Sequence, residues 1–280
     1  MSAAITTNAI DEVFARLKES GETALIPFMT MGDPDLETSV ALVQAAEAAG
    51  AHMIELGIPY SDPLADGPVI QRASERALKN RISLTDCIGV ASKAREKGVR
   101  MPFIIFTYFN PALQLGLERF FGLLQENGFS GAIIPDLPME EDAETKEIAD
   151  RHGIHLIPLV APTSEARVER IASRASGFVY CVSSLGVTGE RSSFHEGIGA
   201  FLATVRKAAS VPICVGFGIS SREQAESLAG QCDGVIVGSA IVRKVEESLP
   251  LLIADDADRK AEGIAAVRDF IAALKPQRVG

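Results

Sequence analysis

The chain has 280 residues, of which 47% are hydrophobic, and a formal net charge of −10. That hydrophobic content supports a sizeable core and excludes a disordered chain. The acidic balance argues against nucleic acids and anionic membranes as partners, because both attract a basic face. No stretch reaches the about 18 uninterrupted apolar residues that a membrane span requires.

The N-terminus and the cysteines indicate the compartment. The first twenty residues lack the basic segment and the apolar segment of a secretory signal. Four widely spaced cysteines form no CxxC pair, which favours reduced core thiols over disulfides or a metal site. These residues are Cys87, Cys181, Cys214 and Cys232. We therefore expect a soluble, cytoplasmic protein.

Eight short, apolar, β-rich runs alternate with segments of helical periodicity along the chain. A predicted helix from about Asn8 to Glu19, capped by Asn8, precedes the first run. The runs cover residues 24–29, 52–56, 103–107, 131–135, 155–160, 177–182, 212–217 and 234–238. Apolar strands separated by helices pair in parallel and are buried on both faces.

Eight such units predict an α/β fold, a single (β/α)8 TIM barrel over residues 1–280 with an extra N-terminal helix. The competing architecture is an open doubly wound sheet. It usually has fewer strands, and no GxGxxG follows the first run.

The stretch ELGIPYSDPLADGP, residues 55–68, contains the candidates for acid–base chemistry. Chemistry in such barrels lies at the C-terminal ends of the strands and in the loops that follow. Strand alternation turns Glu55 into the barrel if helices cover the opposite face, and burial would then raise its pKa. The alternative is a strand-end glutamate that reaches solvent.

Asp66 is the second candidate, although Asp-Gly is also a common turn pair. Asp62 fits a turn former better than a catalyst. Three prolines in the same stretch restrict its backbone, which suits two acids that must keep a fixed separation.

The positions of the lysines and histidines disfavour two other kinds of chemistry. Every lysine falls in a segment with a helical pattern or at a terminus, which argues against a Schiff base or a covalently bound pyridoxal cofactor. His52, His152 and His155 lie at or before strand starts, on the far face of the barrel, and His195 lies in a loop. We therefore expect no metal site.

Two glycine-rich turns predict a phosphate site. VGFGIS (215–220) follows the seventh run and VGSAIVRKV (237–245) follows the eighth, where such barrels often bind phosphate. Gly216 and Gly218 would let backbone N–H groups approach an anion, and Gly238-Ser239 opens a helix whose free amides favour negative charge. The alternative is tight barrel packing at the glycines. The long polar loop at 183–199 predicts a lid, or else a disordered surface excursion.

Five motifs together resemble one family. LIPFMTMGDP, ELGIPYSDPLADGPVIQRA, GVTG, VGFGIS and VGSAIV, in this order and spacing, are similar to the tryptophan synthase alpha chain. The resemblance covers nearly the whole chain and is most specific over residues 55–73. It implies retro-aldol cleavage of indole-3-glycerol phosphate to indole and glyceraldehyde 3-phosphate, with the indole ring as the electron sink. It also implies an alpha2beta2 heterotetramer in which a beta chain holds pyridoxal phosphate, while the alpha chain holds no cofactor.

The resemblance further implies residue roles. Glu55 matches the family's acid and base, and Asp66 matches the carboxylate that accepts a hydrogen bond from the indole N–H. Thr188 matches the lid residue that closes onto that aspartate. The remaining matches are Phe28, Ile70, Tyr108 and Tyr180 around the indole, and Gly189, Gly218, Gly238 and Ser239 around the phosphate.

Two positions depart from the family, and two regions would face the partner. Ser184 and Phe178 stand where many relatives carry arginine and tyrosine, and we expect both to lie around the lid. The loop at Asp62-Pro63 and the region near Asn110-Pro111 would face the beta chain.

Three alternatives stay open at this stage. One is a stand-alone indole-3-glycerol phosphate lyase, which the sequence separates poorly from a subunit. Another is a related phosphate-binding barrel, such as a phosphoribosyl isomerase or indole-glycerol-phosphate synthase, although the synthase would need a strand-end lysine. The third is a silent subunit that only activates a partner, against which the presence of both Glu55 and Asp66 argues.

Overall fold

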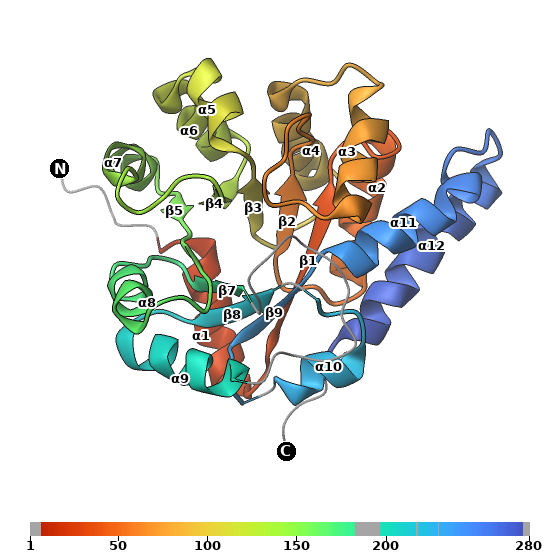
Figure 1. Ribbon diagram of the computed structural model, residues 1–280. Coiled ribbons are helices and arrows are strands. Elements are labelled where there is room, and N and C mark those ends of the chain that lie inside the picture. The colour runs from red at the N-terminus through yellow and green to blue at the C-terminus, as the bar shows by residue number, and fades with distance from the viewer. Residues whose placement is uncertain (1–6, 183–196, 217, 229, 277–280) are drawn as a thin grey trace.

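The computed structural model describes residues 7–182, 197–216, 218–228 and 230–276. In this part of the chain, parallel strands form one curled sheet that helices surround (Figure 1). The strands are β1 Ala24–Thr30, β2 Ile54–Gly57, β3 Phe103–Phe106, β4 Phe129–Ile133, β5 His155–Leu156, β6 Leu159–Val160, β7 Val179–Val182, β8 Ile213–Gly216 and β9 Gly234–Val237. Their order in the sheet is β5-β4-β3-β2-β1-β9-β8-β7-β6.

Except for the first helix, which precedes β1, the helices follow strands along the chain and cover the outside of the sheet. They are α1 Ala9–Ser20, α2 Leu36–Ala48, α3 Pro68–Leu78, α4 Leu84–Glu96, α5 Phe109–Leu115, α6 Leu117–Glu126, α7 Ala143–Arg151, α8 Glu165–Ala172, α9 Ile198–Ala208, α10 Arg222–Ser227, α11 Ser239–Leu252 and α12 Ala257–Leu274. No helix in these residues is long and apolar enough to cross a membrane.

The predicted strand 155–160 consists of two short strands, β5 and β6. They lie at opposite ends of the sheet order, so the chain that connects them closes the barrel. β5 pairs with β4, while β6 pairs with β7. Between them, the Ile157 N–H donates to the Ala132 carbonyl at 2.9 Å, and the Tyr180 N–H donates to the Pro158 carbonyl at 3.0 Å. Pro158 has no N–H to continue a ladder. The two ends of the sheet order are therefore joined by the chain itself, and the predicted eightfold barrel is confirmed.

The predicted N-terminal helix is also confirmed as α1. The Asn8 side chain accepts a hydrogen bond from the Ile10 N–H, and its amide donates to the carbonyls of Ser130 and Gly153. One face of α1 is buried against the barrel interior, where Phe14 makes an edge-to-face contact with Phe178 at 5.9 Å between ring centroids. α1 therefore packs against the interior with Phe178, just before β7, so the expectation that Phe178 lies around the lid is wrong.

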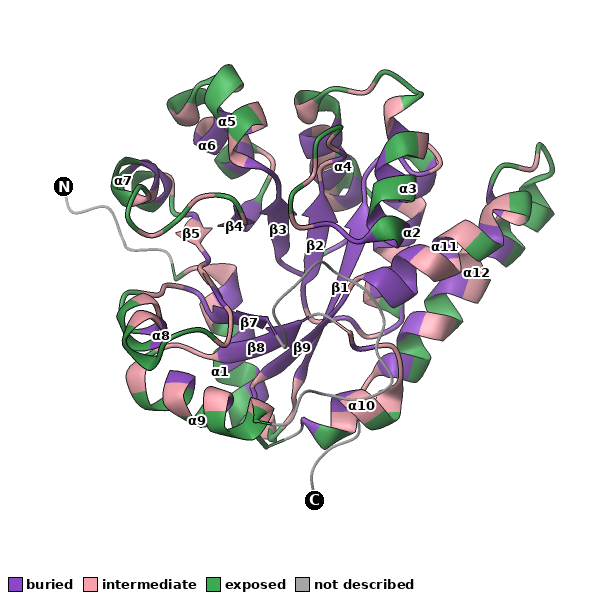
Figure 2. Cartoon of the chain, viewed as in Figure 1, coloured by how far each residue is buried: buried purple, intermediate pink, exposed green. Residues whose placement is uncertain are grey.

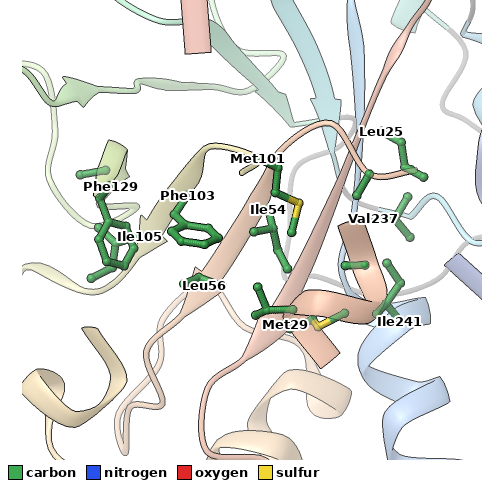
Figure 3. Packing of buried hydrophobic residues seen from close by; sticks show 14 of the residues in the cluster. Leu25, Met29, Ile54, Leu56, Met101, Phe103, Ile105, Phe129, Val237 and Ile241 are labelled. Carbon is green, nitrogen blue, oxygen red and sulfur yellow. The ribbon is translucent and has the colours of Figure 1, made fainter. Parts of the chain in front are cut away.

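Most strand residues are buried (Figure 2), and the barrel has two hydrophobic layers, one on each face of the sheet. Ile54 and Leu56 belong to the layer between strands and helices, which also contains Ile241 of α11 (Figure 3). Met53 belongs to the inner layer. Glu55, between Ile54 and Leu56, therefore lies on the inner face, as strand alternation predicts.

Candidate active site

Glu55 lies inside the barrel on β2, in register with Phe28 of β1 and Ile104 of β3. Its side chain is buried, with the residue only 1% exposed, and Oε1 has no hydrogen-bond partner among the described residues. Burial raises the pKa of this carboxyl well above its usual value. A raised pKa helps a carboxyl to hold a proton that it can donate as a general acid, and the carboxylate that remains can act as a base.

Asp66 lies in the loop between β2 and α3 and is also buried. Burial raises its pKa to about 6, and a hydrogen bond with the Tyr108 hydroxyl opposes that rise. The residue before α3 is Gly67, and no side chain caps this helix. Asp66 therefore precedes the N-cap position of α3.

Tyr108 fixes the Asp66 loop from the neighbouring strand end. It lies at the start of α5, and its hydroxyl accepts a hydrogen bond from the Ala65 N–H at 3.0 Å. Its ring stacks on that of Tyr60, with centroids 5.0 Å apart and planes inclined by 27°. One hydroxyl thus contacts both the backbone and the carboxylate of the same loop.

Apolar side chains surround Glu55 on the inner face. Phe28, Ile70 and Tyr180 belong to the same inner cluster, and Phe28 meets Phe106 edge to face at 5.4 Å between centroids. Burial raises the pKa of Tyr180, and the nearby Glu55 carboxyl adds to that rise when it is ionised. The aromatic rings therefore keep this carboxyl in an apolar setting.

Glycines make room for two of these rings. A Cβ at Gly57 would lie 2.4 Å from the Phe28 ring, and one at Gly216 would lie 2.3 Å from the Tyr180 hydroxyl oxygen. Gly216 is thus required for packing against Tyr180, which supports the packing alternative at this position.

The other predicted phosphate residues lie at the ends of β8 and β9. Gly218 has φ of +86°, a left-handed conformation that favours glycine. Gly238 is the N-cap residue of α11, so the N-cap position provides no side chain for the N–H groups of the first turn. Ser239 is the first residue of α11 and is buried. A Cβ at Gly238 would lie 3.6 Å from the Phe28 Cβ, so this helix start adjoins the residue that pairs with Glu55.

Some predicted residues lie outside the described residues: Thr188, Gly189, Ser184 and His195. Within the described ranges, no group of three or more histidine, cysteine, aspartate or glutamate side chains could hold a metal ion.

The sequence patterns did not predict two features of the site. Arg76 of α3 pairs with Asp33 and Glu246, which are 43 and 170 residues away along the chain. A local sequence pattern cannot predict contacts between residues so far apart. Thr30 is the last residue of β1 and lies on the inner face of the strand. The alternation of side chains along a strand, which predicts that Glu55 points inward, also predicts this position for Thr30.

Residues 14–275 match the model of the family described as tryptophan synthase alpha chain. The chain belongs to this family. Among curated members, the tryptophan synthase alpha chain of Bacillus pumilus is 52% identical over 243 residues, covering 87% of this chain and 91% of the relative. That of Geobacillus kaustophilus is 53% identical over 247 residues, covering 88% and 90%.

Solved structures of the tryptophan synthase alpha chain agree in fold. The subunit alpha from Legionella pneumophila superimposes with a TM-score of 0.82 at 35% identity, covering 95% of this chain and 99% of that one. A Mycobacterium tuberculosis tryptophan synthase chain superimposes with a TM-score of 0.83 at 32% identity, covering 98% and 100%. This alpha subunit is therefore a carbon–carbon lyase of tryptophan biosynthesis, which cleaves indole-3-glycerol phosphate to indole and glyceraldehyde 3-phosphate.

Proposed function

We propose that Glu55 and Asp66 carry out this cleavage, each in a different protonation state. The observation that supports the proposal is the pair of buried carboxyls, one on β2 and one in the loop that follows it. Carboxyls whose environments hold them in different protonation states can divide acid and base roles.

Glu55 acts first as the acid and then as the base. Its proton goes to C3 of the indole ring, which becomes a positively charged indolenine. Glu55 then takes the proton of the hydroxyl on the carbon attached to C3. As that carbon becomes an aldehyde, the C–C bond breaks, and its electron pair returns to the ring. Indole and glyceraldehyde 3-phosphate leave, and Glu55 is protonated again.

Asp66 acts as an anion that accepts a hydrogen bond from the indole N–H. A pKa of about 6 leaves its carboxylate mostly ionised at neutral pH. Its negative charge stabilises the indolenine more than the neutral substrate, so its effect is largest where the positive charge develops. Tyr108, bonded to the Asp66 carboxylate and the Ala65 N–H, holds that charge in place.

The remaining predicted residues bind the two ends of the substrate. Phe28, Ile70 and Tyr180 provide apolar contacts for the indole. The N-terminus of α11, with Gly238 and Ser239, binds the phosphate through its uncapped amides and dipole, together with Gly218 and Gly189. Thr188 would close onto Asp66 from the loop that follows β7.

The partner is a beta chain that carries pyridoxal phosphate, and we place the chain in an alpha2beta2 heterotetramer. Two large apolar side chains are exposed in the regions that the sequence assigns to this contact. Leu64, beside Asp62-Pro63, is 78% exposed, and Leu113, on α5 with Asn110-Pro111, is 50% exposed. Exposed apolar side chains in both of these segments favour a protein partner.

Cofactor, compartment and domain organisation complete the proposal. The alpha chain needs no cofactor of its own, because the protonated indole ring accepts the electrons. Four buried cysteine thiols suit the reducing cytoplasm. We take residues 1–280 as one domain.

The test is indole release from indole-3-glycerol phosphate by the purified chain, with and without a tryptophan synthase beta chain. Slow release that rises on addition of the beta chain supports the subunit assignment. Fast release that the beta chain leaves unchanged points to a stand-alone lyase. No release under either condition overturns the proposal.

A further inference from the structure

Thr30, the last residue of β1, carries a hydroxyl that the proposed chemistry does not use. Along β1, Ala24, Ile26 and Phe28 belong to the inner cluster, while Leu25 and Met29 belong to the outer one. Thr30 continues the inward series, one layer beyond Phe28 toward the strand ends. It is 6% exposed.

The Thr30 hydroxyl has no partner in the described part of the protein. Buried side-chain polar atoms without a hydrogen bond there are Thr30 Oγ1, Glu55 Oε1 and Ser176 Oγ. Such atoms are normally paired, so each one calls for an explanation. Two of the three lie on the inner face of neighbouring strands, at the end of the barrel where the chemistry is placed.

The strand facing Thr30 provides no side chain. Phe28 is in register with Glu55, and Thr30 is in register with Gly57. The space that a side chain at Gly57 would need is filled by the Phe28 ring. The Thr30 hydroxyl therefore lies above Phe28, without a polar neighbour across the strand pair.

The position of β1 in the ring indicates what the hydroxyl binds. β1 lies between β2, which carries Glu55, and β9, which leads into Gly238 and Ser239. A substrate whose reacting carbon is at Glu55 and whose phosphate is at the start of α11 must cross the end of β1. Its three-carbon chain bears two hydroxyls: one loses its proton to Glu55, and the other, on the middle carbon, lies closer to the phosphate.

We propose that the Thr30 hydroxyl hydrogen-bonds the middle, non-reacting hydroxyl of indole-3-glycerol phosphate and so selects for it. This assignment rests on the proposed function. A site built to bind a substrate hydroxyl discriminates against an analogue that lacks it, because a buried polar group is then left unpaired.

The test compares the full-length chain with Thr30→Val, which keeps the shape and loses the hydroxyl, and Thr30→Ser, which keeps the hydroxyl. We expect Thr30→Val to lower kcat/KM for indole-3-glycerol phosphate by at least about ten-fold, and Thr30→Ser to stay within about three-fold of the parent. Thr30→Val should leave the melting temperature unchanged or raised, because an unpaired hydroxyl gives way to a methyl group. A purely structural role predicts the opposite change in stability.

Calorimetric binding of indole-3-propanol phosphate, which lacks both side-chain hydroxyls, completes the test. This analogue should bind the parent and Thr30→Val within about two-fold of each other, since no hydroxyl contact is lost. Equal kcat/KM for the parent and Thr30→Val overturns the assignment, as does a ten-fold loss of analogue affinity. A parent chain that releases no indole overturns the proposed function as well, whereas an active parent with an equally active Thr30→Val overturns the Thr30 assignment alone.

Discussion

Arg76 binds the buried carboxylate of Asp33 through two hydrogen bonds, from Nε at 2.9 Å and from Nη2 at 2.8 Å. Its third donor, Nη1, reaches Glu246 of α11 at 2.7 Å. Burial raises the pKa of Asp33, and the Arg76 guanidinium opposes that rise. One arginine therefore ties α3, which follows the Asp66 loop, to the loop after β1 and to the helix that begins at Ser239.

Arg76→Leu should lower the free energy of unfolding by about 3–5 kcal/mol, because it leaves the Asp33 carboxylate buried without a partner. The matched control is Arg72→Leu, since Arg72 also pairs with Glu246 but is largely exposed. That variant should lose no more than about 1 kcal/mol. Urea denaturation measures both, and equal losses would contradict the role given to Asp33.

Glu55→Gln should lower kcat by about 10²–10⁴-fold, because the amide can neither give nor take the proton. The fold should persist, since a neutral amide replaces a buried carboxyl that lacks a full set of partners. Steady-state indole release and thermal melting check the two statements. Near-normal turnover with an unchanged melting curve would remove Glu55 from the mechanism.

Tyr108→Phe should move the acid side of the kcat profile to higher pH. The hydroxyl lowers the pKa of Asp66, so its removal lets that pKa rise above about 6, and more alkaline solution is then needed to ionise the carboxyl. Tyr60→Phe is the control, because it keeps the stacked ring and leaves the Tyr108 hydroxyl in place. Profiles recorded between about pH 5 and 8 give the shift, and identical profiles for all three proteins would contradict it.

Asp66→Asn should impair catalysis and stabilise the fold. The pKa of Asp66 rises from 3.8 to about 6 on folding, so its ionised form opposes folding at neutral pH. The favourable contribution of the protonated form is complete below about pH 4 and is lost as the pH rises through about 6. The variant should therefore gain on the order of 1–3 kcal/mol over the parent near pH 8, and almost nothing near pH 4. Urea denaturation at the two pH values measures this, and a gain that does not depend on pH would contradict the burial of this charge.

Gly216→Ala should displace Tyr180, because the new methyl group would lie within 2.5 Å of three atoms of that side chain. We expect a loss of about 1–3 kcal/mol in stability, as overpacking usually costs, with reduced turnover. Gly89→Ala is the control, since a Cβ there meets no atom within 4 Å inside α4 and should stabilise the helix by about 0.5–1 kcal/mol. Thermal melting and indole release compare the two, and a harmless Gly216→Ala would mean that the Tyr180 ring can move freely.

The fold could be predicted because its determinants are local. Apolar runs, helical periodicity and the Asn8 cap depend on residues a few positions apart, and the alternating pattern of a strand is enough to turn Glu55 inward. The same alternation predicts that the Thr30 side chain also points inward. The local sequence did not determine where each strand begins and ends. In the run 155–160, for example, the two halves pair with different neighbouring strands.

The sequence by itself therefore determined a barrel of eight strand–helix units and a carboxylate at the end of its second predicted strand. Only the tertiary structure decided that the Tyr108 hydroxyl lies at Asp66, that Gly216 makes room for Tyr180, and that Arg76 joins Asp33 to Glu246. These contacts join residues far apart along the chain, so they exist only after the ring has closed. Packing of the closed barrel, rather than any local preference, sets the distances and the burial on which the pKa values of the site depend.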